Sequence, residues 1–315
     1  MGKRQLLMMG LAAGLPLFLG ACHVNLGSTE TSYTDKVPNP KPYQCTEGEW
    51  DGPGVINGQK LTSQGRLSKS LVFLVHQLSK GSDSASLCTG TLISRDIVLT
   101  AAHCVDGGLE STRAERLAVV FGNDPLCALS KKDQTNIRKA EKIILHPDWS
   151  TSNSGGVDLA LVKLSSDAPW ETRAMDVAND LPSLDDDREI FGAGYGRTTD
   201  YEDAEGDQPY LRIAKLRPQN RVPNQGIMNN PASRRLIFNQ KSEGSLCRGD
   251  SGGPAVVIEG GVAKVIGVAS FVWDPTVTTC KSYVVHTSVS YYREWLMETY
   301  EKLRGTYSAP NPFRR

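Results

Sequence analysis

The sequence lacks an excess of either charge, because 35 Lys and Arg residues balance 35 Asp and Glu residues. A neutral chain has no overall electrostatic field that would attract nucleic acid or an acidic membrane surface. The sequence also lacks internal repeats and low-complexity tracts, and its longest apolar run is too short and too interrupted for a comfortable membrane span. We therefore expect no nucleic acid partner, and we look for the signals of function in local motifs.

The apolar run lies in the N-terminal residues 1–21, which have the composition of an export signal. A basic start, MGKR, precedes the run QLLMMGLAAGLPLFLG. Gly20 and Ala21 stand directly before Cys22, an arrangement that resembles the bacterial lipobox, in which the signal is cut before a cysteine that carries the lipid. Acyl chains on Cys22 would anchor the chain in a bacterial membrane. An ordinary signal peptide with an incidental Cys22 is the alternative.

Residues 22–54 are expected to be a lipidated tether, since residues 27–43 are polar, contain Pro and show no apolar period. The same residues would be a propeptide if the chain is cut before Val55. His23 follows Cys22 at the position where an Asp retains lipoproteins of many bacteria in the inner membrane. We therefore expect a lipid-anchored protein of the bacterial cell envelope, in the outer membrane, with the periplasmic or surface side left open. An envelope without an outer membrane is the alternative.

The number of cysteines, seven, is odd, which leaves one thiol unexplained in an exported protein. Lipidation of Cys22 would leave six, and an oxidising compartment would allow three disulfides. Six cysteines permit 15 pairing schemes. The six are Cys45, Cys88, Cys104, Cys127, Cys247 and Cys280.

Short apolar runs separated by Gly, Asp, Asn and Pro predict an all-β fold, an antiparallel barrel or sandwich. The one amphipathic helix is expected near the C-terminus, where Trp295, Leu296 and Leu303 fall on one face and Gly305 is a stop signal. The expected strands lie within residues 71–75, 90–94, 96–102, 117–122, 142–147, 159–164, 188–196, 234–240, 254–261, 263–273 and 282–289.

Three polar residues have unusual neighbours in or beside these predicted strands. His103 follows an apolar strand in VLTAAHC, and Asp158 opens a buried strand in DLALVKL. Ser251 lies among Gly249, Gly252 and Gly253 in GDSGGP, where the absence of Cβ atoms lets another backbone approach the hydroxyl. Each motif alone is most often structural, but the three together in an exported chain indicate a nucleophile with its base.

The motifs TAAHC, DLALVKL, GYG and GDSGGP, in the chain order His, Asp, Ser, resemble the chymotrypsin family of serine endopeptidases. The resemblance runs from about Val55 to Gly305. It implies two six-stranded antiparallel β-barrels with a C-terminal α-helix, a protease domain at residues 55–305 and a tail at 306–315. It also implies that Ser251 is the nucleophile, His103 the general base and Asp158 the residue that orients the imidazole, with the N–H groups of Gly249 and Ser251 as the oxyanion hole.

In this family, Asp250 pairs with the α-ammonium that is created when the chain is cut before the mature domain. Val55 in GPGVINGQK takes the first position of that domain, but Gly54 precedes it instead of the usual Arg or Lys. An activating protease with another preference, activity without cleavage, and a latent enzyme are the three alternatives.

The resemblance implies disulfides between Cys88 and Cys104 and between Cys247 and Cys280, so that Cys45 and Cys127 remain for the third. That third disulfide would keep a cleaved domain attached to its tether.

The resemblance places Ser245 at the floor of the primary specificity pocket, where an Asp would select Arg or Lys. Without that charge, binding of a basic side chain is unfavourable. Val272 and Val284 narrow the walls for a small or medium apolar residue, and His286 offers the alternative of an acidic residue. Strand residues Ser270, Phe271 and Val272 are expected to pair with extended substrate.

These features predict a secreted, membrane-anchored serine endopeptidase with protein or peptide substrates and an activating protease as a further partner. The alternatives are a catalytically silent binding protein with the same fold and a processing enzyme with one target. We expect no cofactor and no metal, because the acidic runs at 185–189 and 201–207 lack the ligand spacing of a calcium loop.

Overall fold

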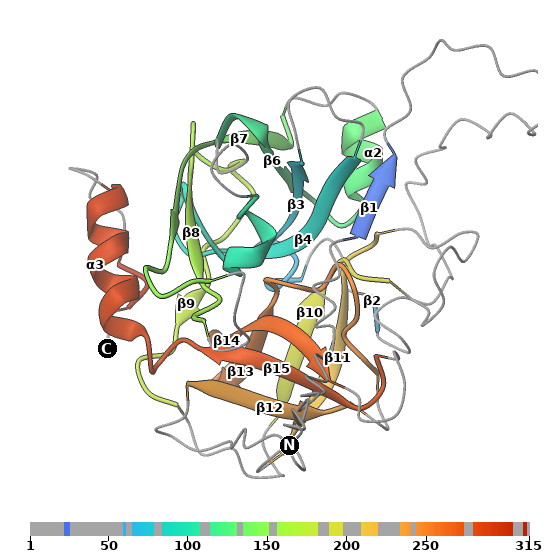
Figure 1. The fold of residues 1–315 in the computed structure, drawn as a ribbon, viewed down its shortest axis with the longest axis vertical. Helices are drawn as coiled ribbons and strands as arrows, with labels where there is room; N and C mark the ends of the chain where they lie inside the picture. The colour runs from blue at the N-terminus through green and yellow to red at the C-terminus, as the bar shows by residue number, and fades with distance from the viewer. Residues whose placement is uncertain are drawn as a thin grey trace, which may run out of the picture.

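A computed structural model of the chain places two β-barrels one above the other, with the C-terminal helix at the side of the upper one (Figure 1). The structure describes residues 65–78, 84–107, 114–130, 135–150, 156–181, 189–197, 209–219, 234–240, 244–273, 280–304 and 311–313, and the backbone alone at 22–25 and 59–60. The two barrels confirm the predicted fold class.

The first barrel is closed by hydrogen bonds in the strand order β4, β3, β6, β7, β8, β5 and back to β4. All of these pairings are antiparallel. Its interior is filled by Val, Leu and Ile side chains such as Leu74, Val119 and Leu161, each fully buried. The strands are β3 (Leu71–Gln77), β4 (Ser84–Leu92), β5 (Ile97–Thr100), β6 (Leu117–Phe121), β7 (Ile137–Leu145) and β8 (Ala160–Leu164).

The second barrel closes in the order β10, β13, β14, β15, β12, β11 and back to β10, again with antiparallel pairs. Its own core contains Leu236, Phe238, Leu246 and Ile266. The strands are β10 (Ile190–Gly194), β11 (Arg212–Pro218), β12 (Arg235–Asn239), β13 (Pro254–Glu259), β14 (Val262–Trp273) and β15 (Tyr283–Ser288).

Three short strands extend the barrels. The strand β2 (Gln59–Lys60) pairs with β11, and β9 (Asp176–Val177) pairs in parallel with β14. The strand β1 (Cys22–Asn25) pairs antiparallel with the first four residues of β4. The first residues of the predicted tether therefore lie against the first barrel.

The C-terminal helix α3 (Arg293–Arg304) has the predicted amphipathic character and ends directly before Gly305. Leu296, Tyr300 and Leu303 are buried against the core of the first barrel, although the helix follows the last strand of the second. The helix thereby ties the end of the chain back to the first barrel. Among the described residues, the other helices are the 3₁₀ turns η1 (Ala102–Cys104) and η2 (Ala114–Arg116) and the short α2 (Pro125–Ser130).

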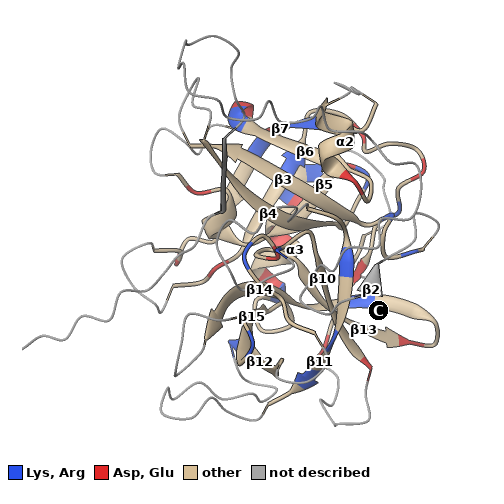
Figure 2. Cartoon of the chain, turned by 90° about the vertical axis from the view of Figure 1, so that its right-hand side faces the viewer, with Lys and Arg blue, Asp and Glu red and all other residues tan. Residues whose placement is uncertain are grey.

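Basic and acidic residues occur on both barrels, as the colours of the cartoon in Figure 2 show for the described residues, in keeping with the balanced composition. Within the described ranges, no helix combines the length and hydrophobicity that a bilayer crossing requires.

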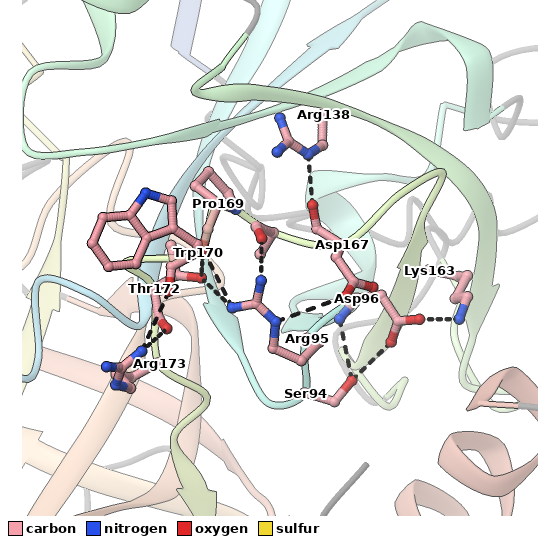
Figure 3. A network of polar contacts seen from close by, with 11 residues as sticks. Ser94, Arg95, Asp96, Arg138, Lys163, Asp167, Pro169, Trp170, Thr172 and Arg173 are labelled. Carbon is pink, nitrogen blue, oxygen red and sulfur yellow. Dashed lines mark hydrogen bonds and ion pairs between the residues drawn. The ribbon is translucent and has the colours of Figure 1, made fainter. Parts of the chain in front are cut away.

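A polar network fixes the ends of β5 and β8 that lie far from His103 and Asp158 (Figure 3). The Arg95 guanidinium donates to the carbonyl oxygens of Ala168 at 2.5 Å and Pro169 at 3.2 Å, so that it holds the loop after β8. Beside it, Asp96 forms an ion pair with Lys163 and accepts a hydrogen bond from Ser94. Because β5 and β8 pair along their length, this network fixes the register that brings His103 beside Asp158.

Candidate active site

His103 and Asp158 form the centre of the site. His103 lies in η1 directly after β5, and Asp158 lies just before β8, which pairs with β5. The Nδ1 of His103 is 2.8 Å from Oδ2 of Asp158, and the His103 backbone N–H donates to Oδ1 at 3.0 Å. Since an ionised carboxylate only accepts, Nδ1 carries the proton and Nε2 is left able to accept one.

Burial and charge act in opposite directions on this pair, whose side chains are only 11% and 7% exposed. Burial opposes protonation of the His103 ring, but the Asp158 carboxylate outweighs it and raises the pKa of His103 above 6.5. Burial likewise opposes ionisation of Asp158, and the attraction and hydrogen bond of His103 outweigh it and lower the pKa of Asp158. The geometry therefore keeps a carboxylate beside an imidazole that can accept a proton and hold it as a cation.

The second barrel also holds Asp158. The Ser270 hydroxyl donates to Oδ2 of Asp158 at 2.5 Å, and the Thr287 hydroxyl donates to the Asp158 carbonyl oxygen at 3.3 Å. Ser270 lies at a shift in the pairing of β14 with β15, between Ala269 and Phe271. A β-bulge of this kind redirects a side chain, which explains how a residue of β14 reaches the carboxylate.

Ser251 lies in a turn whose backbone favours glycine at positions 249 and 252. Gly249 has φ of +96° and Gly252 has φ of +79°, a backbone conformation that L side chains rarely adopt. A Cβ on Gly249 would lie 2.9 Å from the Cα of Gly196, and one on Gly252 would lie 2.4 Å from the Thr89 carbonyl oxygen. In the part of the chain that the structure describes, no acceptor takes the backbone N–H of Gly249 or Ser251.

A short series of bonds connects this turn to His103. The Thr89 N–H donates to the Ser251 carbonyl oxygen at 2.8 Å. Thr89 follows Cys88, and a disulfide joins Cys88 to Cys104, the neighbour of His103. The sequence-predicted residues His103, Asp158 and Ser251 are thus brought to one seam between the two barrels.

The carboxylate of Asp250, a residue that is 1% exposed, lies in a cradle of backbone N–H groups. It accepts the N–H of Gly196 through Oδ1 and the N–H of Cys247 through Oδ2, both at 2.8 Å. A Cβ on Gly194 or Gly196 would lie 2.3 Å from one of its oxygens, which explains the two glycines of GYG. Its predicted partner, Val55, lies outside the described residues.

The residues predicted for the specificity pocket differ in exposure. Ser245 and Val284 are both 2% exposed, and the Ser245 hydroxyl donates to the Gln240 carbonyl oxygen at 3.1 Å. Val272 is 37% exposed and pairs across the strands with Val284. Phe271 packs near Arg235, whose guanidinium carbon is 5.4 Å from the ring centre. Val284 therefore belongs to the apolar core of the second barrel, whereas Val272 lies at its surface.

Two of the predicted disulfides, Cys88–Cys104 and Cys247–Cys280, are confirmed. Cys127 is also disulfide-bonded, and its predicted partner Cys45 lies outside the described residues. Cys22 lies in β1, where the structure describes the backbone alone.

One cluster has the residue types of a metal site: His103 and the sulfur atoms of Cys88 and Cys104 lie within 4.8 Å of one another. The two sulfur atoms are joined to each other, so they are not thiolate ligands, and this cluster does not fit a metal ion.

Two residues that stabilise the site, Thr89 and Gln240, were not among those predicted from the sequence. The Gln240 amide donates to the carbonyl oxygens of Leu246 at 3.1 Å and Cys280 at 2.8 Å, and it accepts the N–H of Leu246 at 2.7 Å. It thus joins the two segments that the Cys247–Cys280 disulfide also joins. An isolated Gln or Thr carries no signal in a sequence, because only the fold creates its partners.

Comparison with known proteins agrees with this geometry. Residues 69–296 match the family model described as Trypsin. Chymotrypsin-like elastase family member 1 of Macaca fascicularis is 31% identical over 76% of this chain and 87% of its own length. The protein of the same name from Bos taurus is 30% identical over 70% of this chain and 81% of its own length. Vitamin K-dependent protein C of Rattus norvegicus is 28% identical over 78% of this chain, which spans about half, 51%, of that protein.

Proposed function

The chain belongs to the trypsin family of serine proteases, and from this premise we propose that it is an active serine endopeptidase. The observation that carries the proposal is the buried His103–Asp158 pair, with Nδ1 and Oδ2 2.8 Å apart, at the same seam as Ser251.

The proposed reaction is an acyl transfer. Ser251 Oγ attacks the scissile carbonyl carbon while Nε2 of His103 takes the hydroxyl proton, and Asp158 stabilises the imidazolium. The N–H groups of Gly249 and Ser251 receive the oxyanion. His103 then gives its proton to the leaving amine as the C–N bond breaks, and a water molecule, deprotonated by His103, hydrolyses the acyl-enzyme and restores the Ser251 hydroxyl.

We propose a preference for small or medium apolar residues on the acyl side of the bond. The buried Ser245 offers no charge to a basic side chain, and Val284 packs into an apolar core with Leu246. A cation in such surroundings would lack a partner. The relatives named as members of an elastase family support this preference.

We further propose that the protein is exported to a bacterial cell envelope and anchored there by lipid on Cys22, as the residues before Cys22 indicate. Replacement of Cys22 by Ser should release the protein from the membrane fraction without change in its specific activity. A membrane-bound Cys22→Ser protein would contradict the anchor.

A fluorophosphonate, which reacts with activated serine hydroxyls, tests the proposed activity. The exported chain and its Ser251→Ala and Asp158→Asn variants are treated and weighed as intact proteins. An adduct on the wild-type chain alone would support the proposal, and the mass would show whether the chain begins at Val55. A wild-type chain that begins at Val55 and forms no adduct would instead indicate a silent binding protein.

Cleavage of a peptide library by the same preparation tests the preference. We expect cleavage after small and medium apolar residues; cleavage after Arg or Lys would refute the preference while leaving the proposed activity intact. Cleavage restricted to one sequence would favour the processing enzyme.

A further inference from the structure

Thr89, in the middle of β4, is a first-barrel residue that bonds the turn around Ser251 directly. It is fully buried, and its hydroxyl and both its backbone polar groups are hydrogen-bonded. The hydroxyl donates to the Gly249 carbonyl oxygen at 2.9 Å and accepts the N–H of Tyr195 at 3.1 Å. The backbone N–H donates to the Ser251 carbonyl oxygen, and the Thr89 carbonyl accepts the hydroxyl of Thr100 at 2.9 Å.

These bonds restrain the peptide groups that follow the two candidate oxyanion donors. The Gly249 carbonyl belongs to the peptide that follows the Gly249 N–H, and the Ser251 carbonyl belongs to the peptide that follows the Ser251 N–H. Gly249, at φ of +96°, has no side chain to limit its own rotation. The direction of its N–H therefore depends on bonds to the peptides on both sides of Gly249. The Arg197 N–H holds the preceding peptide through the Arg248 carbonyl oxygen at 2.8 Å, and the Thr89 hydroxyl holds the following peptide through the Gly249 carbonyl oxygen.

The packing around Thr89 leaves its side chain one orientation. A Cβ on Gly253 would lie 3.2 Å from the Thr89 methyl carbon, and a Cβ on Gly194 would lie 2.9 Å from its hydroxyl oxygen. The methyl group thus faces Gly253 and the hydroxyl faces Gly194 and Gly249. Valine has the same shape, but its second methyl group would face the buried carbonyl of Gly249 and the buried N–H of Tyr195 without bonding either.

We propose that Thr89 is a positioning residue for the oxyanion hole, acting through the Gly249 carbonyl to hold the Gly249 N–H toward the developing negative charge. The proposal rests on the proposed function of the chain as a serine endopeptidase. It predicts that the Thr89 hydroxyl matters more in the transition state than in the ground state, because the oxyanion exists only there.

The test compares Thr89→Val, which removes the hydroxyl, with Thr89→Ser, which retains it. For Thr89→Val we expect kcat to fall roughly 10-fold or more with little change in KM, since loss of a whole oxyanion donor typically lowers kcat about 100-fold to 1,000-fold. The affinity for a peptide boronic acid, which forms a tetrahedral adduct with an active serine, should fall by the same factor. Thr89→Ser should restore both quantities to within about threefold of wild type, as a retained hydroxyl bond requires.

Thr172→Val is the control, because it removes the hydroxyl of a buried Thr that donates to the Pro169 carbonyl oxygen at 2.6 Å, in the loop after β8. We expect a lower melting temperature in both Val variants, and a fall in kcat in Thr89→Val alone. A Thr89→Val variant with a lowered melting temperature but unchanged kcat and boronate affinity would overturn the proposal and leave Thr89 a structural residue.

An NMR measurement of the Gly249 amide distinguishes a failure of the Thr89 proposal from a failure of the proposed endopeptidase activity, because it does not require the chain to be active. If the wild-type chain bound no boronate, the proposed activity would fail, while the resonance would still test Thr89. A Gly249 amide that shifts or broadens in Thr89→Val and returns in Thr89→Ser supports the positioning role, and an unchanged resonance in both refutes it.

Discussion

The buried histidine of the second barrel, His286, should make the protein sensitive to acid. Its ring is fully buried in β15, beside Leu236 and Ala269 of the neighbouring strands and 5.2 Å from the ring of Phe238. Among the described residues, neither ring nitrogen has a hydrogen-bond partner. Burial therefore lowers the pKa of His286 from 6.5 to about 3.

The sign and size of the effect follow from this pKa. The unfolded chain takes up a proton on His286 below pH 6.5, whereas the folded chain takes it up only near pH 3. The contribution of the neutral His286 ring to the free energy of unfolding is therefore complete above pH 6.5 and is lost as the pH falls toward 3. One pKa unit corresponds to roughly 1.4 kcal/mol, so this residue alone should remove about 3 kcal/mol between pH 7 and pH 4.

Replacement of His286 by Leu, which has a similar volume and no charge, removes this term. The free energy of unfolding in urea would be measured at pH 7 and pH 4 in a Ser251→Ala background, so that self-cleavage is absent. We expect the Leu variant to lose about 3 kcal/mol less than the parent between the two pH values.

Phe238→Leu serves as a control for packing. It removes the ring that contacts His286 but not the titrating group, so it should lower stability equally at both pH values. Equal losses in the parent and the His286→Leu variant would show that His286 is not buried in a neutral form, and would refute the reasoning.

Three further substitutions test separate contacts. Ser270→Ala removes the hydroxyl that donates to Asp158, and kcat/KM should fall roughly 10-fold because a bond to a charged group is worth about 1.5–3 kcal/mol. Gly196→Ala places a Cβ 2.3 Å from the Asp250 carboxylate, and urea unfolding should show a loss of about 1–3 kcal/mol together with lower activity. Gly260→Ala is strained by its φ of +56° but has open space around it, so it should lower stability and retain activity. Arg95→Leu removes the bonds to the loop after β8, and calorimetry should show a stability loss of about 2 kcal/mol while kcat at 25 °C stays unchanged, because Arg95 is 32% exposed and distant from Ser251. Unchanged kcat/KM in Ser270→Ala, or unchanged stability in either of the other two, would contradict the contact concerned.

The sequence was most informative where apolar runs were uninterrupted. The runs at 71–75, 117–122 and 254–261 became β3, β6 and β13, because a strand buried on the barrel interior must be apolar. The strand β11 was missed, since Arg212, Lys215 and Arg217 break its apolar run. Arg212 is nevertheless fully buried, and its Nη1 donates to the Tyr210 carbonyl oxygen. Hydrophobic periodicity does not predict that an Arg is buried in this way.

Prediction of the site from the sequence was limited in the same way. The motifs pointed to His103, Asp158 and Ser251 and to two disulfides, because those residue types and their order are distinctive. The contacts that hold them come from Thr89, Gln240 and Thr287, which are common residue types distant in sequence from their partners. Only the closed barrels bring such residues to the seam.

Each barrel supplies hydrogen-bond donors to residues of the other barrel across that seam. Ser270 and Thr287 of the second barrel hold Asp158 of the first, while Thr89 of the first holds Gly249 and Ser251 of the second. Synthesis runs from the N-terminus, so His103 and Asp158 leave the ribosome well before Ser251. A half-made or half-folded chain therefore has no assembled site, and any hydrolysis begins only after both halves have folded and docked. In the proposed endopeptidase, the division of the site between barrels would thus protect the proteins that surround the chain while it is being made.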